Sequence, residues 1–203
     1  KIFDYVRNNK KYYKNTTTII YGLDSDLIML SLNHLYTCKS IYLYRETLEF
    51  INNINKDLNS NENYLLNIKY LGKLIIDEMT NMLVNVNVKK NNLVCDYILM
   101  CFLLGNDFVY QNPAFNIRNG GLNILMDNYK DAFEGNYTLT ENGVINWKHF
   151  KKFIKLLSLK EEEYLQENYE KRNVLESKLR NRLRKIYKDN NNDLEIYEFK
   201  LQN

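Results

Sequence analysis

Hydrophobic and polar positions divide the chain into short strands and longer helices. A β-branched and aromatic run at residues 16–23 (TTTIIYGL) predicts a buried strand, and residues 40–44 (SIYLY) predict a second. Apolar positions at helical spacing predict helices over residues 26–35, 71–84, 121–133 and 147–157. The order strand, helix, strand is typical of α/β architecture.

The remaining segments complete this prediction. Residues 1–14 predict the end of a helix, residues 64–69 a third strand, and the Asn-rich residues 52–63 a loop. The longest apolar run, residues 93–105 (LVCDYILMCFLLG), contains Asp96 and is shorter than the roughly 20 apolar residues that span a bilayer, so it predicts a buried helix. Residues 160–188 are charge-rich and predict a long solvated helix. We expect an α/β fold, a sheet with flanking helices, whose C-terminal part is mostly helical.

Composition narrows the function classes only slightly. The 28 Lys and Arg residues against 25 Asp and Glu give a net charge of +3, which permits a polyanionic partner without requiring one. Three cysteines without CxxC spacing argue against a disulfide framework and against a zinc site, and they favour a reducing compartment. The abundant Asn, Lys, Ile and Tyr indicate an AT-rich genome, which weakens any motif built from Lys or Asn. The first residue, Lys1, lies in predicted helix, so we expect an excised fragment.

Two carboxylates follow the first predicted strand. Asp24 and Asp26 lie one residue apart in YGLDSDLIMLSL, residues 21–32, at the strand-to-helix turn where open α/β folds bind ligands. Two close carboxylates repel each other, and a divalent cation such as Mg²⁺ or Mn²⁺ offsets that repulsion. The alternative is that Asp24 caps the helix while Asp26 points to water. The DxD spacing alone favours this alternative.

A third carboxylate changes that balance. Asp107, in LLGNDF at residues 103–108, comes just after the buried apolar helix and is again placed at an edge. Its alternative role is a residue of an Asx turn at the helix end. Asp24, Asp26 and Asp107 are the candidate metal ligands.

Taken together, YGLDSDLIML, the Arg45–Glu46 pair after the second strand, and DYILMCFLLGNDF resemble the XRN family of 5′→3′ exoribonucleases. In that family the first motif reads like YGLDADLIML and the later one like DWVLMGFLVGNDF. The resemblance covers most of residues 1–165, and KIFDYVR at residues 1–7 looks like the segment directly after the family's GEGEH motif.

This resemblance implies a PIN and flap-endonuclease-like nuclease core, with residues 1–135 as its C-terminal portion and residues 136–203 as a helical extension. It implies that Asp24, Asp26 and Asp107 bind Mg²⁺ or Mn²⁺, as two ions in a two-metal hydrolysis of phosphodiester bonds. The implied substrate is single-stranded RNA with a 5′ monophosphate, inside the cell in the cytoplasm or nucleus, with no membrane partner and the oligomeric state left open. The other family acids lie upstream of Lys1, so we expect this fragment alone to be inactive.

One departure and two rival functions remain. Where the family commonly has IPHLP after GNDF, residues 109–113 read VYQNP, so Gln111 or Asn112 replaces the histidine. The first rival is a flap-endonuclease-type DNA nuclease, although a Gly-rich helix–hairpin–helix run is missing after Asp107. The second rival is a catalytically inactive relative that binds RNA or protein as a scaffold.

Other charged residues favour structural roles. We expect a solvated helix face for Lys148, Lys151, Lys152 and Lys155, with phosphate contact as the alternative. Asp96 is expected to be a buried, hydrogen-bonded side chain, with support of Asp107 as the alternative. His34 and His149 lack the partners of a catalytic triad.

Overall fold

A three-stranded sheet organises the first half of the chain. The structure, a computed structural model, describes residues 1–44, 59, 62–83, 86–107, 109–115, 117 and 120–188. Strand β1 (Thr17–Tyr21) pairs in parallel with β2 (Ser40–Tyr44), with Thr17 opposite Ser40 and Tyr21 opposite Tyr44. Strand β3 (Leu65–Asn67) pairs antiparallel with the other edge of β2. The three predicted strands are therefore confirmed, although β1 and β3 are shorter than expected, since Ile68 and Lys69 already belong to the following helix.

Helix α3 (Asp26–Leu32) forms the crossover between the two parallel strands. It ends earlier than predicted, at Leu32, and turns follow up to β2. The predicted N-terminal helix is divided at Asn9 into α1 (Ile2–Asn8) and α2 (Lys10–Tyr13), and the buried Phe3 of α1 stacks against His34. Arg45 and Glu46, and all of residues 52–63 except 59, 62 and 63, lie outside the described residues.

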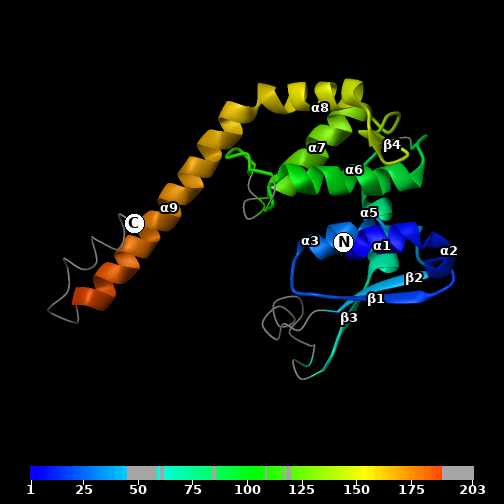
Figure 1. The fold of residues 1–203 in the computed structure, drawn as a ribbon. Helices are drawn as coiled ribbons and strands as arrows, with labels where there is room; N and C mark the ends of the chain where they lie inside the picture. Colours follow the sequence, from blue (N-terminus) through cyan, green and yellow to red (C-terminus); the bar gives the residue numbers. More distant parts are fainter. Residues whose placement is uncertain are drawn as a thin grey trace.

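Two long helices build the core beside the sheet (Figure 1). Helix α5 (Ile68–Met82) contacts β2, α3 and α6 (Lys90–Leu103), and its buried face carries Ile68, Ile75 and Met79. Helix α6 begins three residues earlier than its apolar run predicts, because its first turn is made of polar residues. Its buried residues are continuous with those of α5 in one core.

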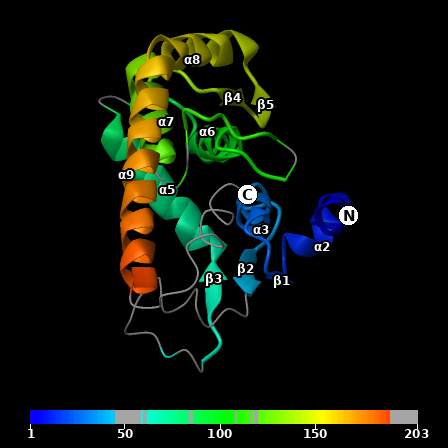
Figure 2. The same ribbon diagram turned by 90° about the vertical axis from the view of Figure 1, so that its left-hand side faces the viewer.

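The second half of the chain is mostly helical, as expected. Helix α7 (Gly121–Phe133) packs on α6, and α8 (Trp147–Leu159) packs on α7 (Figure 2). Between them lies a hairpin that the sequence analysis did not predict, β4 (Thr140–Glu141) with β5 (Val144–Ile145). Asn142 and Gly143 turn this hairpin with φ of 52° and 81°, the left-handed pair that Asn-Gly favours.

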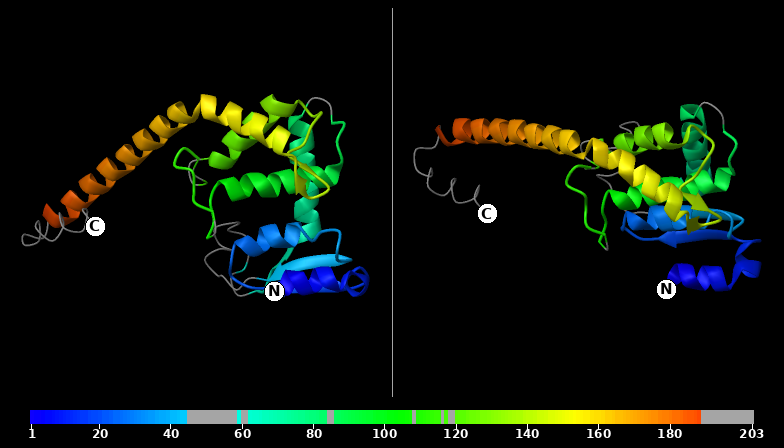
Figure 3. Two further views of the ribbon diagram at one scale, coloured as in Figure 1. Left: turned by 45° about the horizontal axis from the view of Figure 1, so that its top comes forward. Right: turned by 90° about the horizontal axis from the view of Figure 1, so that it is seen from above.

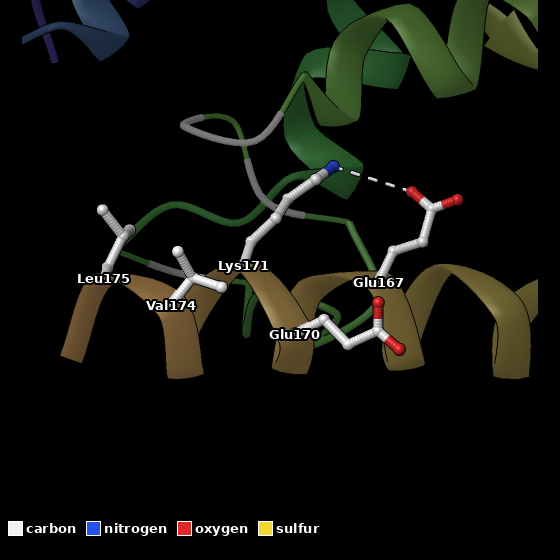
Figure 4. Close-up of a pocket in the computed structure, with 5 residues that line it drawn as sticks. All are labelled: Glu167, Glu170, Lys171, Val174 and Leu175. Carbon is white, nitrogen blue, oxygen red and sulfur yellow. Dashed lines mark ion pairs between the residues drawn. The ribbon is translucent and has the colours of Figure 1, made fainter. Parts of the chain in front are cut away.

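Helix α9 (Glu161–Lys188) extends away from the body of the molecule (Figure 3). A shallow hollow on it is lined by Val174 and Leu175 beside the Lys171–Glu167 ion pair of 3.6 Å (Figure 4). The prediction of a long solvated helix is confirmed. Within the described part of the chain, no helix is both long and apolar enough to cross a membrane.

Candidate metal centre

The β1–α3 turn lies at the carboxyl edge of the sheet and holds two of the three candidate ligands. Asp24 is exposed in the turn, and its Oδ1 accepts a hydrogen bond of 2.8 Å from the backbone N–H of Asp26. Ser25, at the N-cap position, makes no side-chain capping bond. Asp24 therefore bonds to the start of α3 from the position before the N-cap, and this bond uses one carboxylate oxygen only.

Asp107 enters the same region from the end of α6. Gly105 has a φ of 94° and turns the chain out of the helix. Asn106 then closes a reciprocal turn, since its N–H donates to the Val109 carbonyl at 3.0 Å and its Oδ1 accepts from the Val109 N–H at 2.8 Å. The Asx turn considered for Asp107 is thus made by Asn106, and the side chain of Asp107 lies exposed on the turn.

Asp26 is influenced electrostatically by the other two carboxylates. The pKa of Asp26 is raised, first by partial burial and then by the negative charges of Asp24 and Asp107. Two segments more than eighty residues apart in sequence therefore concentrate negative charge around the first residue of α3. Carboxylate oxygens are the ligands that Mg²⁺ and Mn²⁺ prefer, and a divalent cation offsets this repulsion. The chemistry of the donors fits such an ion.

The described residues do not complete a metal site by themselves. Among them, no group of three or more His, Cys, Asp or Glu side chains is close enough to hold an ion. Asp24, Asp26 and Asp107 therefore do not form a closed metal-binding group within the described part of the chain.

Two tyrosines that sequence reasoning did not single out lie next to the carboxylates. Tyr21 and Tyr44 end the paired strands, and their rings lie 5.6 Å apart between centroids. Tyr21 is 59 % exposed. The ends of two parallel strands fall at one edge of a sheet, and that rule could have identified this pair from the sequence.

Asp96 lies elsewhere and supports the fold. It is fully buried, and Tyr129 Oη and the Leu139 N–H each donate to its Oδ2 at 2.7 Å, while the Thr140 N–H at 2.7 Å and Thr140 Oγ1 at 2.6 Å donate to its Oδ1. Burial raises the pKa of Asp96 to about 6 against the opposing effect of these four hydrogen bonds. Asp96 therefore joins α6 to α7 and to the β4 region. The expectation of a buried, hydrogen-bonded Asp is confirmed.

The other charged residues also keep structural positions. His34 is buried, and its Nδ1 lies 2.6 Å from the Leu30 carbonyl, so it donates there; burial lowers its pKa. Lys148, Lys151, Lys152 and Lys155 are all exposed, so the prediction of a solvated lysine face is confirmed. Lys152 also donates to the Ala132 carbonyl and lies over the Phe133 ring.

Replacing Gly105 by alanine tests the backbone that positions Asp107. A Cβ at Gly105 would lie 2.7–2.9 Å from Gln111 Cβ, Cα and N, in a left-handed conformation. Gly143 has a φ of 81° but open space around it, so it is a matched control. We expect Gly143→Ala to cost about 1–2 kcal/mol of unfolding free energy, and Gly105→Ala about 1–3 kcal/mol more. Equal costs in urea unfolding would contradict the close approach.

Two family sequence models match this chain. The sequence model described as the Xrn1 helical domain matches residues 87–202, and the one described as the XRN 5′-3′ exonuclease N-terminus matches residues 1–47. The chain belongs to the XRN family, and the resemblance inferred from the motifs is confirmed.

Individual relatives carry the same family name. The chain is 30 % identical to 5′-3′ exoribonuclease 2 of Arabidopsis thaliana, over 82 % of this chain and 20 % of that protein. It is 34 % identical to 5′-3′ exoribonuclease 1 of Schizosaccharomyces pombe, over 72 % of this chain and 12 % of that protein, and 30 % identical to 5′-3′ exoribonuclease 1 of Homo sapiens, over 90 % and 11 %. The chain thus spans about a fifth or less of the length of these curated relatives.

Proposed function

We propose that this chain contributes three ligands to the active centre of a divalent-metal-dependent 5′→3′ exoribonuclease that hydrolyses single-stranded RNA. The observation that carries the proposal is the electrostatic effect of Asp24 and Asp107 on Asp26, whose pKa is raised first by partial burial and then by these two charges. The named activity of the relatives supports the substrate class.

The proposed role of each aspartate follows from its position in the site. Two bound ions would supply the activated water and the stabilisation of the leaving 3′ oxygen. Asp24 would hold an ion through Oδ2 while Oδ1 keeps the α3 turn in shape, and Asp26 and Asp107 would contribute from α3 and from the Asn106 turn. The remaining ligands would come from acids upstream of Lys1, so residues 1–203 alone are expected to be inactive.

The terminal base of the bound RNA would lie near the ends of β1 and β2. Tyr21 offers an exposed ring at the same edge as the carboxylates, and an aromatic ring stacks on any base without sequence preference. The three cysteines are free in the structure, which fits an enzyme working inside the cell, in the cytoplasm or nucleus.

The test uses the full-length protein with RNA labelled at its 5′ or 3′ end, carrying a 5′ monophosphate or a 5′ hydroxyl, and matched flap DNA. We expect mononucleotides to be released from the 5′ end of RNA only when Mg²⁺ or Mn²⁺ is present. The monophosphate end should be preferred. Cleavage of flap DNA with RNA left intact would favour the DNA nuclease, and bound but undegraded RNA would favour the inactive scaffold.

A further inference from the structure

A lysine-lined cavity lies at the edge of the sheet opposite to the carboxylates. The cavity measures about 620 Å³ and is lined by residues of the α2–β1 connection, the α3–β2 turn, α5 and the start of α6. Its charged lining residues are Lys14, Lys39, Lys69, Lys73, Lys90 and Asp77. Lys39 directly precedes β2, whereas Asp24 follows β1, so the length of the parallel strands, roughly 15–20 Å, separates the two sites.

The cavity is held in shape by backbone contacts. The N–H of Lys39 donates to the Tyr13 carbonyl at 3.0 Å, which ties the α3–β2 turn to the end of α2. On the other side, a Cβ at Gly72 would lie 2.5 Å from Leu35 Cδ1, so the Leu35 side chain packs directly on α5 at this glycine. The lysine cluster therefore lines a defined hollow in the fold.

The five lysines lie exposed around the cavity with few compensating charges. Within the described part of the chain, none of the five forms an ion pair. Lys69 and Lys73 are four residues apart on α5, where like charges repel, and Asp77, four residues after Lys73, is the one acidic residue of the lining. Lys90 is the first residue of α6, whose first turn holds no acidic residue and whose amino end carries the positive end of the helix dipole.

An anion would relieve all of these costs at once. Five lysines against one aspartate give the cavity a larger positive excess than the whole chain, whose net charge is +3. Several ammonium groups spread around one hollow suit a ligand with several negative charges more than they suit a single carboxylate.

The other wall of the cavity indicates which polyanion fits. Tyr36 is 65 % exposed at its rim, and Leu35, Cys38 and Ile76 supply apolar surface. Lysines that neutralise phosphates beside an exposed aromatic ring are the combination by which proteins bind single-stranded nucleic acid without reading its sequence. We propose that this cavity is a second binding site for single-stranded RNA, remote from the metal centre.

Variants in the full-length protein test this proposal by affinity. The triple variant Lys39→Ala, Lys69→Ala, Lys73→Ala is compared with the triple variant Lys148→Ala, Lys151→Ala, Lys155→Ala, which removes the same charge from exposed positions on α8, away from the cavity. Binding of a fluorescent RNA is followed by anisotropy in EDTA, where metal-dependent hydrolysis does not contribute. Failure of the proposed nuclease function and failure of this site are therefore distinguishable.

The expected results separate charge from stacking. The cavity variant should lose at least about tenfold in affinity at 0.1 M salt, and the slope of log K against log salt should fall in magnitude by about 2, since each phosphate contact on a single strand contributes about 0.7. The α8 variant should bind nearly as the wild type. Tyr36→Ala should weaken binding about five- to hundredfold with the slope unchanged. Equal losses in the two triple variants would overturn the proposal.

Lysine acetylation provides a second readout that needs no substitution. RNA bound to the wild-type protein should protect Lys39, Lys69 and Lys73 from a water-soluble acetylating reagent, and leave Lys148, Lys151 and Lys155 reactive. Unchanged reactivity of the cavity lysines at saturating RNA would overturn the proposal. Protection by poly-glutamate but not by RNA would assign the cavity to an acidic protein and would also overturn it.

Discussion

Replacing Asp24 by asparagine is expected to reduce metal-dependent RNA hydrolysis by about a hundredfold or more while leaving the fold intact. The amide keeps an oxygen that can accept the 2.8 Å hydrogen bond from the Asp26 N–H, but it removes the charge that would hold an ion. The measurement is the rate of RNA shortening by the full-length protein in Mg²⁺, with thermal unfolding in EDTA as the control for stability.

The alanine variant separates the two roles of Asp24. Asp24→Ala should be as inactive as Asp24→Asn, and it should also lose the capping bond, worth about 0.5–2 kcal/mol, against which the loss of one repelling charge is a partial gain. Asp131→Asn on α7 is the control for removing an exposed carboxylate elsewhere. If Asp24→Asn retains full activity and only the alanine variant is impaired, Asp24 is a capping residue and not a metal ligand.

Replacing Asp96 by asparagine is expected to destabilise the protein by about 2–4 kcal/mol. Each carboxylate oxygen of Asp96 accepts one backbone N–H, from Leu139 and from Thr140. In either orientation of an asparagine amide, its NH₂ group faces one of these N–H donors, and two buried donors are left opposed. Free energies of unfolding from urea titration, compared with the exposed Asp131→Asn, measure this cost.

The hydroxyl partners of Asp96 do not remove that conflict. Thr140 Oγ1 also lies 3.4 Å from the Asn92 carbonyl and Tyr129 Oη lies 3.5 Å from the Tyr137 carbonyl, so both hydroxyls can turn to another acceptor. The backbone N–H groups cannot turn in this way. A cost below about 1 kcal/mol would show that the β4 segment moves to accept the amide.

Local pattern is sufficient to place the elements of the sheet and two of the candidate ligands. The β-branched run that ends at Tyr21 is followed closely by carboxylates, and this order places Asp24 and Asp26 at the carboxyl edge from the sequence alone. The start of α6 is predicted less well, because periodicity detects apolar positions and the first turn of this helix is polar. The β4–β5 hairpin was missed although Asn142–Gly143 carries the signal for its turn.

The positions of segments that are far apart in the sequence cannot be derived from local pattern. The nearness of Asp107 to Asp26 depends on how α6 lies against α3, and in the sequence only the family resemblance suggests it. The exchange of roles between Asn106 and Asp107 in the turn depends on side-chain geometry. The lysine cavity combines segments from residues 14 to 90, so neither net charge nor any local motif could show it.

The most direct test of the central claim, that Asp24, Asp26 and Asp107 hold divalent ions, is a Mn²⁺ titration of the full-length protein followed by electron paramagnetic resonance. The account predicts two ions bound per wild-type chain. It predicts affinity weakened at least about tenfold by Asp24→Asn or Asp107→Asn, and unchanged by Asp131→Asn. Undiminished Mn²⁺ binding in both ligand variants would contradict it.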